Sequence, residues 1–124
     1  MKLRMSSHSI RFRLRQSEVR HLAEVGWVET TVALANGNLR CSLQLFEGPA
    51  QASLSGMQLS VRIPSEDGKR WAASTEVGLT YALIGGTRLD VEKDFACLEP
   101  RTEEANADTF LRPSGDVEPG GMKA

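Results

Sequence analysis

Residues Ser9–Arg15 read SIRFRLR, and residues Gln58–Pro64, 49 positions later, read QLSVRIP. These two segments belong to a longer gap-free match of residues 6–38 with residues 55–87, in which eight pairs are identical. Chance alone gives about two identities over such a length, from the usual residue frequencies. One small unit therefore occurs twice, and we expect the fold to pair two half-domains within one chain as a homodimer pairs two subunits.

Strict alternation marks both segments as half-buried strands, because successive side chains of a strand point to opposite faces. In the first copy Ile10, Phe12 and Leu14 share one face, and arginines occupy the other. The second copy alternates in the same way, with four apolar positions on one face: Met57, Leu59, Val61 and Ile63. A short strand precedes each segment, over residues 2–6 and 50–55.

A short helix is expected after each alternating strand. In the first copy Ser17 is the candidate N-cap, Glu18 suits the positive end of the helix dipole, and Gly26 ends the helix. In the second copy Ser65 is the candidate cap, and Trp71 is expected to anchor the helix.

Each copy then closes with a two-stranded hairpin. Residues 28–34 and 39–45 alternate around Asn36-Gly37, a pair that favours a type I′ turn, and residues 77–83 and 89–95 flank Gly85-Gly86. Trp27 is expected to be a core or interface anchor like Trp71. Lys93 falls on the inward face and is expected to have a structural role. The fold class is therefore mainly β with two short helices, built from two ββαββ repeats.

The chain divides into a single domain and a tail. Residues 1–98 form the domain, with repeat one at 1–48 and repeat two at 49–98. Residues 99–124 carry six acidic residues, three prolines and three glycines, and we expect this acidic tail to be disordered. Net charge is +3 for residues 1–48, −1 for residues 49–98 and −3 for the tail.

A cytoplasmic location is expected. No apolar run approaches the ~20 residues of a membrane-spanning helix, and the polar first residues do not form a signal peptide. The two cysteines, Cys41 and Cys97, lie in unrelated contexts, so reduced thiols are the simplest interpretation.

Residues Ser55–Pro64 resemble the opening of AbrB/MazE-type swapped-hairpin domains, the SpoVT-AbrB-like domains. Gly56 and the run Val61-Arg62-Ile63-Pro64 match that opening, whereas Met57 and Gln58 replace the usual Asn and Ser. Applied twice, the resemblance covers about residues 2–97. It implies a pseudo-twofold swapped-hairpin β-barrel in which one polypeptide supplies both halves, and hence a monomeric pseudo-dimer.

Proteins of this kind are DNA-binding transition-state regulators and antitoxins, and basic side chains on and before the second strand approach the DNA. The resemblance transfers this role to Arg4, Arg13 and Arg62. Arg11 and Arg15 extend the same outward face by alternation, whereas Ser53, the match of Arg4 in the second copy, is neutral. The chain is thus expected to be an AbrB/MazE-like DNA-binding regulator or antitoxin-like protein, with duplex DNA as its partner. A solvated arginine face without a ligand is the simpler interpretation of the same residues.

The alternative function is a non-enzymatic protein-interaction module that does not bind DNA. The acidic tail, with Phe110 and Leu111 as apolar anchors, or an exposed strand edge would capture the protein partner. The competing interpretation of the tail is an uninvolved chain end.

No catalytic, metal or cofactor site is expected. His8, His21, Cys41 and Cys97 do not lie at metal-ligand spacing, and zinc normally needs three or four such ligands. Cys97 also lacks an evident activating base, so the chain is not expected to be an enzyme.

Overall fold

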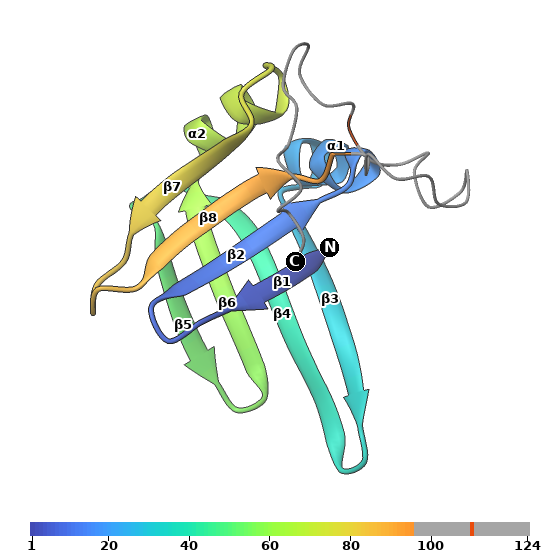
Figure 1. The fold of residues 1–124 in the computed structure, drawn as a ribbon. Coiled ribbons are helices and arrows are strands. Elements are labelled where there is room, and N and C mark those ends of the chain that lie inside the picture. Colours follow the sequence, from blue (N-terminus) through green and yellow to red (C-terminus); the bar gives the residue numbers. More distant parts are fainter. Residues whose placement is uncertain (96–109, 111–124) are drawn as a thin grey trace, which may run out of the picture.

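The computed structural model describes residues 1–95 and Phe110, and this part of the chain holds eight strands and two helices (Figure 1). Each repeat has the order ββαββ, as the alternation predicts. The elements of the first repeat are β1 (Lys2–Met5), β2 (Ser9–Leu14), α1 (Gln16–Val25), β3 (Trp27–Leu34) and β4 (Gly37–Phe46). The elements of the second repeat are β5 (Gln51–Ser55), β6 (Gln58–Pro64), α2 (Ser65–Ala72), β7 (Gly78–Ala82) and β8 (Arg88–Lys93).

The strands form two four-stranded mixed sheets, and each repeat contributes one hairpin to each sheet. Sheet A has the order β1-β2-β8-β7, and sheet B has the order β3-β4-β6-β5. Parallel pairing of β2 with β8 joins the repeats in sheet A, and parallel pairing of β4 with β6 joins them in sheet B. In Figure 1 the strands of sheet A cross over those of sheet B. The described strands remain two sheets, so a closed barrel is not found.

The internal duplication is visible at the centre of each sheet. Phe12 of β2 lies beside Val91 of β8, and Val61 of β6 lies beside Leu43 of β4. All four side chains are fully buried. Phe12 and Val61 therefore occupy equivalent positions in equivalent sheets, which confirms the pairing of two similar halves.

The 49-residue spacing holds through the first hairpin and the helix but not beyond. Val28 pairs with Leu43, and the equivalent pair in sheet A is Leu79 with Val91. Leu79 therefore takes the place of Val28, and Val77, its match in the gap-free comparison, is exposed. The cause is the connection before the strand, because Gly26 alone separates α1 from β3 whereas residues 73–77 separate α2 from β7.

Helix α1 begins two residues earlier than expected. Its N-cap position is Arg15 rather than Ser17, and the Arg15 backbone N–H donates to the Glu18 carboxylate at 2.9 Å. Gly26 ends the helix as expected, with φ of 103° and its N–H donating to the Leu22 carbonyl at 2.9 Å.

Helix α2 begins at Ser65, with Pro64 rather than Ser65 at the N-cap position. Trp71 is fully buried and donates its indole N–H to the Val77 carbonyl at 3.2 Å, so its anchoring role is confirmed. Gly68 is buried against β4, where a Cβ atom would lie 2.3 Å from Cδ2 of Leu45. A side chain at this position would therefore force Leu45 or the helix to shift.

Two expectations about the first repeat are wrong. Trp27 is 47% exposed rather than a core anchor, because Val28 points inward and its neighbour must point outward. The β3–β4 turn comprises Ala35 and Asn36, flanked by the pair Leu34 and Gly37. No residue other than glycine has positive φ in the described chain, so the turn is not type I′.

The core lies between the two sheets and under the helices. It includes Lys93, which is buried as the alternation predicts. The Lys93 ammonium donates to the Ser74 carbonyl at 2.6 Å and lies 5.7 Å from the centre of the Trp71 ring. Burial lowers the pKa of Lys93, and these contacts give it the expected structural role.

Candidate functional site

The outward face of sheet A gathers basic side chains from three neighbouring strands. Phe12 and Leu14 of β2 point into the core. Arg11 and Arg13 alternate with them along the strand and therefore point outward. The register places Arg4 of β1 beside Arg11, and the remaining basic positions extend the same face. We call this surface the basic face, and its members are Lys2, Arg4, Arg11, Arg13 and Arg88.

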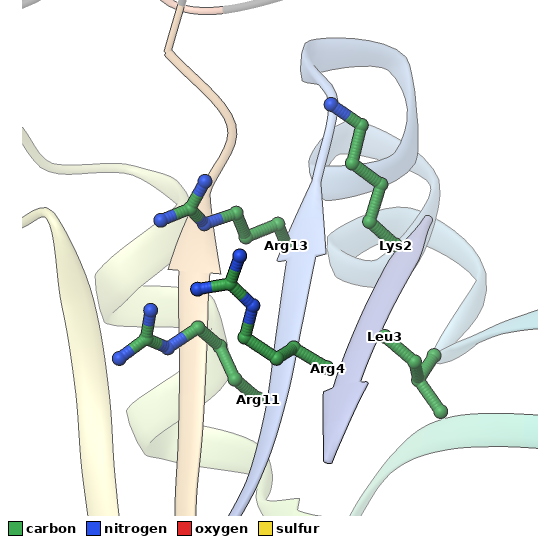
Figure 2. Close-up of a pocket in the computed structure, with 5 residues that line it drawn as sticks. All are labelled: Lys2, Leu3, Arg4, Arg11 and Arg13. Carbon is green, nitrogen blue, oxygen red and sulfur yellow. The ribbon is translucent and has the colours of Figure 1, made fainter. Parts of the chain in front are cut away.

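A cavity of about 290 Å³ opens on the basic face. Figure 2 shows the guanidinium groups of Arg4, Arg11 and Arg13 turned in the same direction, from β1 and β2 toward β8. Lys2 and Leu3 of β1 complete the lining. Among the described residues Arg4 forms no ion pair, so its positive charge is available to a ligand.

Carboxylates on β8 partly neutralise the face. Glu92 lies between two guanidinium groups, with its oxygens 3.7 Å from Nε of Arg11 and 3.5 Å from Nε of Arg13. Asp90 is buried and accepts hydrogen bonds from Thr80 at 2.8 Å and from Arg88 at 3.1 Å.

A third carboxylate lies at the rim of the face. Asp94 follows β8, and its Oδ2 lies 3.2 Å from the Lys2 ammonium. The five cations of the basic face therefore exceed these three carboxylates by two charges. The surface therefore keeps a net positive charge, which favours an anionic ligand.

The outward face of sheet B is different, although the topology makes it equivalent. Arg62 matches Arg13 and Arg40 of β4 takes the place of Arg88, but Ser60 replaces Arg11 and Ser53 replaces Arg4. The Arg62 guanidinium lies 5.7 Å from the centre of the Phe46 ring. Only one of the two equivalent sheets thus carries a cluster of cations.

The residues named from the sequence are divided by the structure into three places. Arg4, Arg11 and Arg13 come together on the basic face, whereas Arg62 lies on sheet B. Arg15 lies at the start of α1, with its guanidinium 3.6 Å from the Glu18 carboxylate.

Sequence reasoning missed two members of the basic face. Lys2 could have been found, because it alternates with Arg4 along the first strand. Arg88 could not, because only the parallel pairing of β2 with β8 brings it to this surface.

Phe110 is the one described residue of the acidic tail. It lies against Phe95, with ring centres 5.8 Å apart, and its N–H donates to the Asp94 carbonyl at 2.7 Å. Leu111 lies outside the described residues, as do Cys97 and the rest of the proposed tail.

The described residues contain no group of three or more His, Cys, Asp or Glu side chains that could hold a metal ion. His21 Nδ1 lies 2.8 Å from the Trp27 carbonyl, and burial raises the pKa of the Cys41 thiol. Within residues 1–95, neither helix has the length and apolar character needed to cross a membrane.

Comparison with known proteins gives one match. A family model described as "Family of unknown function (DUF7009)" matches residues 1–114. No curated protein and no solved structure matches the chain.

Proposed function

Since the chain belongs to DUF7009, a family of unknown function, we propose its function from its surface: it binds duplex DNA through the basic face, as an AbrB/MazE-like regulator or antitoxin-like protein. The observation that carries the proposal is the convergence of Arg4, Arg11 and Arg13 on one cavity. Lys2 and Arg88 extend the cationic surface on either side.

The topology supports the AbrB/MazE-like part of the proposal. Each sheet combines the first hairpin of one repeat with the second hairpin of the other, which is an exchange of hairpins within one chain. The Val61-Arg62-Ile63-Pro64 run ends β6 and leads into α2, the position that the sequence resemblance implies.

The chemistry of the face favours phosphate contacts over base recognition. Arginine and lysine neutralise phosphates and release counterions, so the affinity falls steeply with salt. If all five cations of the basic face contacted phosphates, the slope of log K against log salt would be about −4.5. Because the equivalent surface of sheet B lacks the matches of Lys2, Arg4 and Arg11, one molecule offers one such cluster and does not require a palindromic site.

A protein-interaction module without DNA binding is the second candidate. It is favoured by the ion pairs within the basic face. Glu92 pairs with both Arg11 and Arg13, and Asp94 pairs with Lys2. These pairs reduce the charge offered to phosphates and are typical of a solvated surface.

Fluorescence anisotropy with a labelled random-sequence duplex, at about 50 mM salt and above, separates the two candidates. We expect binding by the unaltered protein, and a slope reduced by about 2 when Arg11 and Arg13 both become alanine. The matched controls are Arg62→Ala on sheet B and Lys69→Ala on α2, which should leave the slope unchanged. Undetectable binding of the unaltered protein at low salt would refute the DNA proposal and leave the protein-interaction module.

A further inference from the structure

One of the two edge strands of sheet B, β5, is open and uncharged. All five residues of β5 are exposed, and Leu54 is 73% exposed. Strand β6 pairs with one side of β5, and no described strand pairs with the other side. Unpaired N–H and C=O groups along that side can therefore bond to another strand.

The equivalent edge of sheet A is protected by charge. Strand β1 carries Lys2 and Arg4, and the matching positions of β5 are Gln51 and Ser53. Lysine and other charged side chains on an edge strand oppose the approach of a second identical strand. This protection is therefore present on one edge of the duplicated fold and lost from the other.

We propose that β5 pairs antiparallel with β5 of a second copy of this chain. An antiparallel pair centred on Ser53 uses the whole strand and obeys twofold symmetry, so both copies offer the same surface. Ser53 then faces Ser53 of the partner subunit, and Ala52 faces Leu54 of the partner subunit. No charged side chain of β5 meets its own copy, and the two B sheets become one continuous sheet.

Apolar side chains beside the edge support this pairing. Leu54 and Ala52 pair with the inward-facing Leu59 and Val61, so both lie on the inward-facing side of sheet B, where Leu54 is 73% exposed. Pairing at β5 places Ala52 and Leu54 of the partner subunit beside Leu54 and Ala52 of the first copy, on the same side of the joined sheet. The core of the two repeats is complete within one chain, so the edge contact adds to it without replacing any part of it.

A site-specific disulfide tests the register. Directly opposed residues of an antiparallel pair have Cα atoms about 4.5–5.5 Å apart, within the range that a disulfide spans. Ser53→Cys, in a Cys97→Ser background, should give a covalent dimer on mild oxidation, because the remaining Cys41 is buried. The matched control is Thr31→Cys in the same background, at an exposed position of β3 on the opposite edge of the same sheet. Equal cross-linking of the two variants, or none of Ser53→Cys, would overturn the proposal.

Sedimentation velocity of the unaltered full chain supplies a second measurement. We expect the weight-average mass to rise toward that of a dimer between about 5 and about 200 µM, by mass action. Ser53→Lys places like charges opposite each other and should abolish that rise, whereas Thr31→Lys should not. A monomer throughout this range, or an identical response of both lysine variants with unchanged circular dichroism, contradicts the pairing. If Ser53→Lys fails to fold, the disulfide experiment decides.

Discussion

Replacing Gly68 with alanine tests how closely α2 must approach β4. In an exposed helix the change would stabilise the protein by about 1 kcal/mol, because alanine has the higher helix propensity. In this fold the added Cβ would lie 2.3 Å from Cδ2 of Leu45 and 3.4 Å from its Cδ1 and Cγ. Leu45 is only 9% exposed and belongs to the core, so it has little room to rotate away.

Whether Gly68→Ala stabilises or destabilises the protein follows from comparing the gain in helix propensity with the cost of the clash. Overpacking a dense core costs about 1–3 kcal/mol, and a contact this short belongs in the upper part of that range. After the gain in helix propensity is subtracted, Gly68→Ala should lower the free energy of unfolding by about 1–2 kcal/mol. Urea unfolding with an unchanged m value measures this difference.

A double-mutant cycle separates the clash from other effects. Leu45→Val removes the Cδ atoms and should itself cost about 1 kcal/mol, near the value of one buried methylene. In that background Gly68→Ala should stabilise the protein by about 1 kcal/mol, because only the propensity term remains. Stabilisation by Gly68→Ala in the unaltered background would refute the reasoning, since it would mean that Leu45 moves aside at no cost.

Two further predictions concern charge and pH. Glu92→Gln removes the carboxylate shared by Arg11 and Arg13, so DNA affinity at about 50 mM salt should rise; unchanged or weaker binding in the anisotropy assay would contradict the role of the basic face. Burial, followed by the hydrogen bond to Asp67 and its charge, raises the pKa of Tyr81, the chain's single tyrosine, so its phenolate absorbance should appear at higher pH in the folded than in the urea-unfolded protein. Because the folded pKa is the higher one, this stabilisation is complete below about pH 10 and is lost above it; Tyr81→Phe should abolish that decline in the free energy of unfolding.

The first hairpin and the helix of each repeat could be predicted from the sequence because their signals are local. Alternation fixes which side of β2 faces the core, and the position of Phe12 follows from it directly. The same rule would have placed Trp27 outside, since Val28 points inward. The prediction that Trp27 is an anchor relied on residue type instead of on the alternation. The structure agrees with the alternation, because Trp27 is exposed.

The second hairpin could not be placed because its register depends on partners distant in the sequence. Leu79 and Val28 occupy equivalent positions only because β8 pairs with β2 of repeat one and β4 pairs with β6 of repeat two. For the same reason Arg88 was absent from the candidate site. A residue that reaches a surface only through parallel pairing with the other repeat gives no local pattern to detect.

Duplication within one chain explains why the two sheets differ so much on their surfaces. In a homodimer each substitution appears on both halves, so a charge on one edge strand must also stand on the other. A fused pair is released from that constraint, and here Arg4 and Arg11 stand in one half where Ser53 and Ser60 stand in the other. The smaller number of cations on sheet B is the reason both for placing DNA on sheet A and for proposing that β5 pairs with a second copy. Both proposals therefore arise from the same asymmetry, yet they are tested at different residues.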